Sequence, residues 1–186
     1  MISAIGTRPV ARAAVLGAYL LLVEWTRTLV TSAPFAVAPA LILGGVALSV
    51  AAVGWPPSRL GLGTSRLPLR LIGGCALGVV LLLPAAARAY AVPTLPAGLA
   101  LAAVAVSIGE ELAFRGALYA ALEDVGGAPL AVLGTTALWT LAHALSHPPA
   151  FLAAVAAAGL LLGLWRWACK DLVGPILAHV VADIAL

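Results

Sequence analysis

The sequence predicts an all-α membrane protein, a polytopic bundle of about seven transmembrane helices that forms a single integral membrane domain over residues 1–186. Its composition is the first reason. Of its residues, 63% are hydrophobic and only 9% are charged, whereas soluble domains have about 45–50% apolar and about 25% charged residues. The mean hydropathy of +1.14 agrees with this. Several apolar stretches also approach the roughly 20 residues that a helix needs to cross the hydrocarbon core. Strict alternation of apolar and polar residues is absent, which argues against a transmembrane barrel.

Proline and glycine mark the ends of the expected spans. The first span follows Arg8 and Arg12, and we expect a retained helix rather than a signal peptide, because no small-residue cleavage site follows it. "GWPPSRLGLGTSRLPLR" separates the second span from the third, "PTLP" precedes the fourth, and "EDVGGAP" and "SHPP" flank the fifth. The expected spans are 11–31, 35–54, 70–88, 98–122, 128–146, 150–167 and 171–186. Small residues are expected to let these helices pack closely, for example Gly44, Gly45, Gly73, Gly74 and Gly78.

The basic residues predict the orientation in the membrane. If the N-terminus is cytoplasmic, only Arg27 and Arg88 lie near the outer ends of their spans. The cytoplasmic side then carries Arg8, Arg12, Arg59, Arg66, Arg70, Arg166 and Lys170. The opposite orientation would reverse this ratio, so we expect the N-terminus to be cytoplasmic and the C-terminus to lie outside. The composition, rich in Ala, Leu and Arg, suggests a high-GC bacterium, so we expect a multi-pass protein in the lipid bilayer of a bacterial inner membrane. The formal net charge of +3 follows from this asymmetry, and without a basic stripe interleaved with aromatic residues we expect no nucleic-acid partner.

Six titratable residues lie deep in the apolar spans, where a charge costs at least about 2.5–3.5 kcal/mol. They are Glu110, Glu111, Arg115, His143, His179 and Asp183. Glu111 and Arg115 are four residues apart, so they share a helix face and can pair. Glu110 is turned about 100° from Glu111 and can point into a cavity. His179 and Asp183 are also four apart, on the last span.

These residues favour the hydrolysis of an amide by water. His143 comes from a third helix, one turn after Trp139, so three helices bring polar groups toward a common centre. A carboxylate and an imidazole on either side of a water form a general-base pair, and a second imidazole can stabilise the oxyanion. Ser107 lies one turn before Glu111 without a nucleophile signature, so water is the expected nucleophile. We expect no metal and no cofactor.

Helix arithmetic leaves the depth of this centre unsettled. At 1.5 Å per residue, Glu110 lies about 18 Å below the outer end of its span, but His143 lies only about 5 Å below its own. The two helix ends must therefore be staggered, or the fifth helix must sit deeper. On average the centre falls between mid-membrane and the outer leaflet, which predicts a cavity open to the extracytoplasmic side.

Three motifs, in the right order, resemble a known family. "EELAFRG" resembles the EExxxR signature of the CPBP family (CAAX protease and bacteriocin-processing, also called Abi), whose members are intramembrane glutamic endopeptidases of the type II CAAX prenyl endopeptidase kind. "WTLAH" resembles the FxxxH motif of this family, and "HVVAD" resembles its HxxxN or HxxxD motif. The resemblance covers residues 98–186, the catalytic half of the domain, and the first three helices carry no signature.

The resemblance implies catalytic roles for four residues. Glu110 looks like the catalytic glutamate, which activates the water together with His143. His179 and Asp183 look like the pair that stabilises the oxyanion. Asp183 departs from the asparagine of the eukaryotic enzymes, and an ionised aspartate would repel an oxyanion. The resemblance therefore implies that Asp183 orients His179, holds it protonated, or is protonated itself.

The resemblance also implies supporting residues and a substrate. Glu111 and Arg115 look like residues that orient the site or the peptide, and Trp139 replaces the phenylalanine of the motif while keeping an aromatic wall. The expected partner is a peptide or a membrane-anchored protein, cleaved near its C-terminus or its membrane anchor. The myxosortase-like bacterial branch of the family is one candidate for the type of enzyme.

Three other functions stay open at this point. "HALSH" places His143 and His147 four apart, as in zinc helices, but Ala144 stands where the H-E-x-x-H motif has its glutamate. Buried Glu, His and Asp residues also line proton or ion pathways, although a small transporter would more often show two related halves with broken helices. A catalytically silent member of the family could act as a membrane immunity or binding protein.

Overall fold

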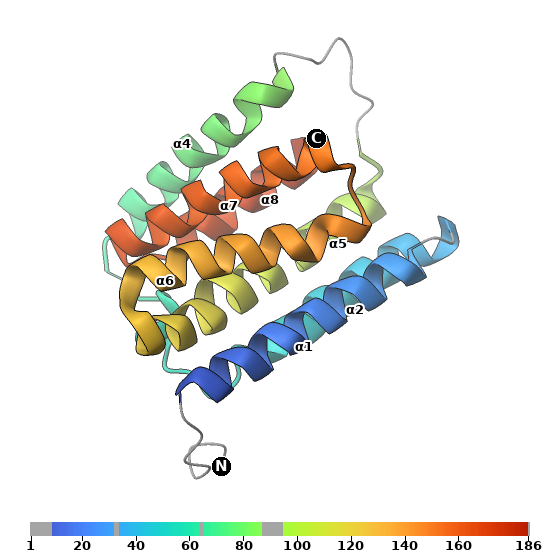
Figure 1. The fold of residues 1–186 in the computed structure, drawn as a ribbon. Coiled ribbons are helices and arrows are strands. Elements are labelled where there is room, and N and C mark those ends of the chain that lie inside the picture. The colour runs from blue at the N-terminus through green and yellow to red at the C-terminus, as the bar shows by residue number, and fades with distance from the viewer. Residues whose placement is uncertain (1–8, 32–33, 64, 87–94, 186) are drawn as a thin grey trace.

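A computed structural model describes residues 9–31, 34–63, 65–86 and 95–185, which form helices and turns without a strand among them (Figure 1). This all-α architecture confirms the predicted fold class. Arg8 and Arg88 lie outside the described residues. The helices are α1 (Pro9–Val30), η2 (Pro34–Ala36), α2 (Val37–Val50), α3 (Pro57–Leu60), α4 (Leu67–Ala86), α5 (Ala97–Glu110), η3 (Glu111–Leu118), α6 (Tyr119–Ala142), η4 (His143–Leu145), α7 (Pro149–Cys169) and α8 (Val173–Ala185).

The fourth and fifth expected spans lie in one continuous helical stretch that folds back on itself. The backbone leaves helical geometry at Gly126 and Gly127, and Gly127 has a φ of +71°, which favours glycine. Pro129 follows this bend. Figure 1 shows the chain reversing direction there, and α6 then packs against η3, α1 and α7. The "EDVGGAP" segment therefore separates two passes, as the sequence predicts.

Three helical stretches within the described residues are long and apolar enough to cross a membrane, namely Pro9–Val30, Ala97–Leu145 and Pro149–Cys169. Three shorter apolar helices accompany them: Val37–Val50, Leu67–Leu83 and Val173–Ala185. Large apolar side chains stay exposed on the outside of the bundle, for example Val15, Leu22, Leu43 and Leu101. A protein whose outer surface is this apolar is a membrane protein, because lipid tails can cover such side chains at no cost.

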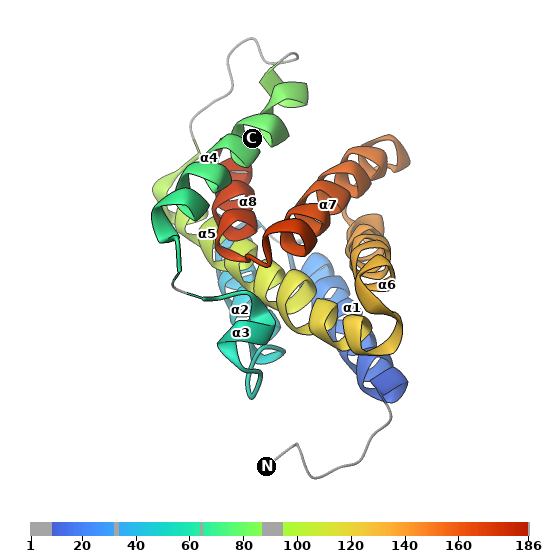
Figure 2. The same cartoon turned by 90° about the vertical axis from the view of Figure 1, so that its left-hand side faces the viewer.

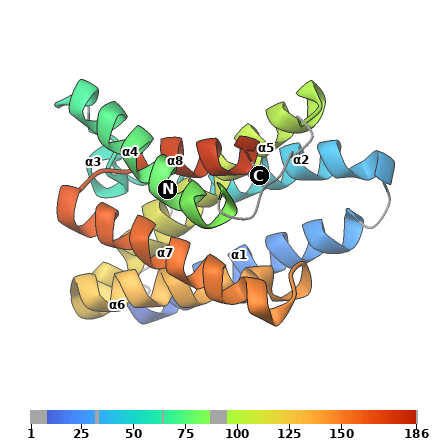
Figure 3. The same ribbon diagram turned by 90° about the horizontal axis from the view of Figure 1, so that it is seen from above.

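The helices form two rough layers. In one layer α4 packs on α8, α8 on α5 and α5 on α2, and in the other α7 packs on α6 and α6 on α1 (Figure 3). Glycines permit the closest approach between α2 and α5: a Cβ added at Gly109 would lie 2.3 Å from the carbonyl oxygen of Gly45. The close packing that the sequence predicts at Gly45 is therefore present, and it places the helix that carries Glu110 directly against α2.

Charged side chains gather at one end of the bundle, the end where α1 begins and α6 bends in Figure 2. Asp124 forms ion pairs with Arg12 and Arg59 there. The buried Asp171 caps α8 by accepting hydrogen bonds from the backbone N–H groups of Val173 and Gly174. Other basic residues of the predicted cytoplasmic group are connected to this region: Arg70 pairs with Asp171, Lys170 pairs with Glu123, the buried Arg166 donates to the Arg59 carbonyl oxygen, and Arg66 lies one turn before Arg70. A second polar cluster lies inside the bundle, away from this end.

Candidate active site

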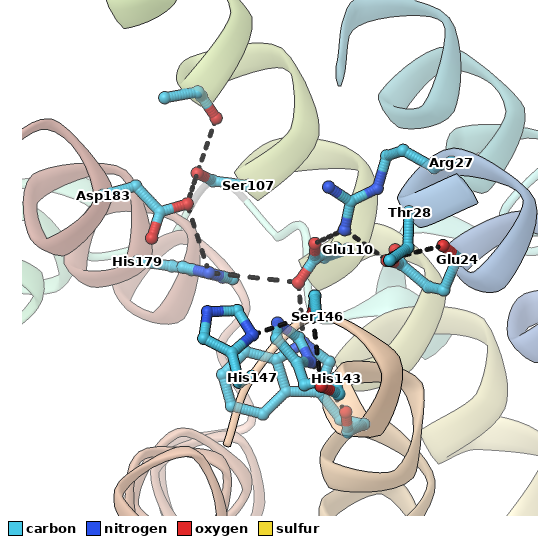
Figure 4. A network of polar contacts seen from close by, with 12 residues as sticks. Glu24, Arg27, Thr28, Ser107, Glu110, His143, Ser146, His147, His179 and Asp183 are labelled. Atoms are coloured by element: carbon cyan, nitrogen blue, oxygen red, sulfur yellow. Dashed lines mark hydrogen bonds and ion pairs between the residues drawn. The ribbon is translucent and has the colours of Figure 1, made fainter. Parts of the chain in front are cut away.

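The inner polar cluster centres on Glu110, the last residue of α5, which is only 3% exposed. The indole Nε1–H of Trp139 on α6 donates a hydrogen bond of 2.7 Å to its Oε2. The Nη2 atom of Arg27, on α1, is 3.3 Å from Oε1 of Glu110, and the Nε2 atom of His179, on α8, is 4.0 Å from Oε2. Figure 4 shows Glu110 between His179 on one side and Arg27 on the other. Three helices thus contact one buried carboxylate.

Glu111, the next residue, shares His179 with Glu110 and pairs in addition with Arg115. It is fully buried, and its Oε1 lies 2.9 Å from Nη1 of the buried Arg115 and 2.9 Å from Nδ1 of His179. The pairing of Glu111 with Arg115 that the sequence predicts is therefore present. The guanidinium of Arg115 also stacks over the Trp139 ring, 4.2 Å from its centroid. Glu111 links the π-helical segment to α8 through His179.

A change of helix type separates the two adjacent glutamates. α5 is α-helical up to Glu110, and η3 is a π-helix that begins at Glu111 and ends at Leu118. Such segments carry i→i+5 hydrogen bonds and often occur at functional sites. The sequence analysis assumed α-helical geometry through this stretch and did not predict the π-helix. Both carboxylates are nevertheless buried; Glu110 contacts Arg27 and Trp139, Glu111 contacts Arg115, and His179 lies between the two carboxylates.

His143 opens η4, one turn beyond Trp139. Its Nδ1 lies 2.8 Å from the Trp139 carbonyl oxygen, which can only accept, so Nδ1 carries the proton and Nε2 of a neutral ring is free to take one. The His143 ring packs edge-on against Trp139 at 4.8 Å and interacts electrostatically with Glu110. Glu110 lies more than three turns from the start of α5, whereas η4 ends at Leu145, two residues after His143.

Asp183 lies beside His179 at a half-open edge of the cluster. Its Oδ2 is 3.5 Å from His179 Nε2, and its side chain is 34% exposed. Ser107, which is fully buried, has its Oγ 2.7 Å from the same Oδ2 and 2.7 Å from the Ala103 carbonyl oxygen, so its single proton serves one acceptor at a time. The sequence analysis considered Ser107 only as a nucleophile and missed this contact with Asp183.

Arg27 and Glu24 of α1 also belong to the site. The sequence places Arg27 near the outer end of its span, and in the structure it forms an ion pair with Glu24. However, Glu24 is only 1% exposed, and the guanidinium of Arg27 reaches Glu110. The signal that could have found them is a charged i,i+3 pair inside an otherwise apolar span, which is costly unless it faces the bundle interior.

His143 and His147, which the sequence offers as a possible zinc-binding pair, are not part of a metal-binding group. The two rings are 5.5 Å apart, and His147 stacks on Phe151 at 4.6 Å while its Nδ1 contacts Ser146 Oγ at 2.8 Å. Partial burial, and then the proximity of His143, lower the pKa of His147 below its usual value. In the part of the chain that the structure describes, no three His, Cys, Asp or Glu side chains are arranged to hold a metal ion.

Comparison with known proteins adds one finding. The family model for type II CAAX prenyl endopeptidase Rce1-like proteins matches residues 92–185, half of the chain. No curated protein and no solved structure matches the chain. The matched region includes Glu110, His143 and His179, whereas Arg27 lies outside it.

Proposed function

Because the chain belongs to the Rce1-like family of type II CAAX prenyl endopeptidases, a peptidase family, we propose that it is a glutamate-dependent intramembrane endopeptidase with Glu110 as its general base. The observation that carries this proposal is the burial of the Glu110 carboxylate among Trp139, His143 and His179, three side chains from α6, η4 and α8. A buried, fixed carboxylate beside an imidazole with a free nitrogen is the arrangement that water activation requires.

In this proposal, water attacks the carbonyl carbon of the scissile peptide bond. As it attacks, the water gives one proton to the general-base pair that Glu110 forms with the free Nε2 of His143. The same proton then passes to the leaving nitrogen as the C–N bond breaks. One C–O bond forms and one C–N bond breaks, so hydrolysis needs no other reactant. The products are a carboxylic acid, which keeps the second proton of the water, and an amine, and transfer of that proton gives a carboxylate and an ammonium group.

His179 is the proposed oxyanion stabiliser. Carboxylates face both of its ring nitrogens, Glu111 at Nδ1 (2.9 Å) and Asp183 at Nε2 (3.5 Å). Two such neighbours favour a doubly protonated ring that can donate toward a developing negative charge. We assign Asp183 to holding His179 in this state, and Glu111 with Arg115 to fixing its orientation. This role for Asp183 avoids the repulsion that a direct contact with an oxyanion would bring.

The proposed substrate is a membrane-anchored protein that is cleaved near its C-terminus or its anchor, because the site lies inside a lipid-facing bundle. Two fluorogenic peptides test the proposal on the purified protein. One carries an S-farnesyl cysteine and a three-residue tail, following the name of the family, and the other carries an unmodified apolar C-terminal helix. We expect cleavage of at least one peptide, with the rate unchanged after exhaustive chelation.

Two results would oppose this proposal. Loss of cleavage on chelation, with recovery on adding zinc, would favour a metalloprotease that uses His143. Intact peptides in both assays, with a folded protein, would favour the binding, immunity or transport functions that the sequence leaves open. A comparison of exported protein C-termini between the wild type and a Glu110→Ala strain would then identify the natural substrate of an active enzyme.

A further inference from the structure

We propose that Arg27, from the half of the chain outside the family match, is a positioning residue that fixes the carboxylate of Glu110 for catalysis. The inference rests on the proposed function of Glu110. Arg27 Nη2 lies 3.3 Å from Oε1 of Glu110, while Trp139 Nε1 donates to Oε2 at 2.7 Å. Each carboxylate oxygen therefore has one donor, and the two donors come from different helices, so rotation of the carboxylate is restricted from both sides.

Arg27 is itself held in place by Glu24, one turn earlier on α1. The two side chains form an ion pair, and Glu24 is only 1% exposed with its Oε1 left without a hydrogen-bond partner. A buried ion pair of this kind contributes little or nothing to stability compared with apolar packing. The ion pair lies next to Glu110, and Nη2 of Arg27 contacts both Glu24 and Glu110. Glu24 therefore holds the guanidinium where it reaches the proposed base (Figure 4).

Gly44 of α2 provides the space that Arg27 occupies. A Cβ at Gly44 would lie 2.6 Å from the Arg27 Cδ, closer than any real contact permits. Beside this point, a groove of about 390 Å³ opens between α1 and α2, lined by Arg27 and apolar residues such as Leu22, Leu43 and Ala47. An added methyl group at Gly44 would therefore push the Arg27 stem into the groove, away from Glu110, without removing any charge.

The charge of Arg27 also suits a base in this position. Glu110 shares the cluster with the carboxylates of Glu24, Glu111 and Asp183. Repulsion among neighbouring carboxylates opposes ionisation, and a cation at hydrogen-bond distance favours the charged form that accepts a proton. Arg27 therefore supplies orientation and charge together, and both act on the chemical step rather than on the binding of substrate.

The test uses the two fluorogenic peptides and measures kcat and KM separately. The double variant Glu24→Gln/Arg27→Met removes both charges of the pair, so that neither is left buried alone. We expect its kcat to fall about 10- to 100-fold, the effect of losing a hydrogen bond to a charged group, while KM changes little. Arg27→Lys keeps the positive charge and should recover part of the rate.

Gly44→Ala gives an independent test if the double variant folds poorly. We expect a fall in kcat of about 10-fold or more, since displacement of a positioning group by about 1 Å can cost up to about 100-fold. Gly98→Ala is the matched control, because a Cβ at Gly98 meets nothing within 4 Å, and its kcat should equal that of the wild type.

Two results would overturn the inference: wild-type kcat in both the double variant and Gly44→Ala, or a raised KM with kcat unchanged, which would make Arg27 a substrate contact. Glu110→Gln separates this outcome from a failure of the proposed function. An inactive Glu110→Gln with a fully active Gly44→Ala would remove only the role of Arg27, whereas an active Glu110→Gln would remove the proposed base itself.

Discussion

The two adjacent glutamates are expected to differ sharply in what they contribute to stability. Replacing Glu111 by Gln leaves the guanidinium of Arg115 fully buried without a charged partner, because Nη1 of Arg115 contacts only Glu111 among the carboxylates. The same change weakens the 2.9 Å contact to His179. Replacing Glu110 by Gln keeps an acceptor for Trp139 and leaves Arg27 paired with Glu24.

The magnitudes follow from these contacts. Breaking a buried ion pair by removing one partner typically costs about 3–5 kcal/mol, because the other charge stays uncompensated. Glu111→Gln should therefore lower the free energy of unfolding by about 3 kcal/mol or more. Glu110→Gln weakens two long contacts, at 3.3 Å to Arg27 and at 4.0 Å to His179, and relieves repulsion from neighbouring carboxylates, so we expect a change within about 1 kcal/mol, of either sign.

Thermal unfolding of the two variants and the wild type in one detergent measures this ranking. A loss of about 3 kcal/mol is a large fraction of the roughly 5–15 kcal/mol that holds a protein folded, so the Glu111→Gln transition should lie clearly below the others. The reasoning is refuted if Glu110→Gln melts lower than Glu111→Gln, or if Glu111→Gln melts with the wild type.

Three further outcomes are expected. Trp139→Phe keeps the aromatic wall but removes the 2.7 Å hydrogen bond to Glu110, and kcat/KM should fall about 10-fold; an unchanged value would show that this donor is dispensable. Gly109→Ala places a Cβ 2.3 Å from the carbonyl oxygen of Gly45, so melting should reveal a loss of about 1–3 kcal/mol, and a wild-type melting curve would contradict the close approach of α2 and α5. A lone cysteine at Ser146, in a background free of other cysteines, should react with a membrane-impermeant reagent added outside intact cells, whereas labelling only from the cytoplasm would reverse the predicted orientation.

Local signals were enough to predict the helices. Composition, the length of the apolar runs, and the Pro and Gly positions between them place the long helices within a few residues of their expected spans, whereas the short α3 lies in the segment expected to be a connector. The bend at Gly126 and Gly127 is an example, since the paired glycines marked it directly. The i,i+4 spacing of Glu111 and Arg115 likewise predicted an ion pair that depends only on helix geometry.

Contacts between distant segments could not be read in the same way. Arg27 and Glu110 are 83 residues apart, and no local periodicity indicates which helices become neighbours. The π-helix at Glu111 changes the backbone hydrogen-bond register, which residue spacing does not reveal. The Trp139 indole donor was missed for a related reason, because its direction toward Glu110 depends on how α6 packs against η3 and α1.

The most direct measurement of the central proposal is peptide cleavage by Glu110→Gln and His143→Ala, each purified and checked for a wild-type elution volume and melting curve. Each change removes one member of the proposed general-base pair, which typically contributes about 10²–10⁴-fold to the rate. The proposed mechanism therefore predicts that both folded variants lose cleavage of a peptide that the wild type hydrolyses. Near-normal turnover by either variant would contradict it.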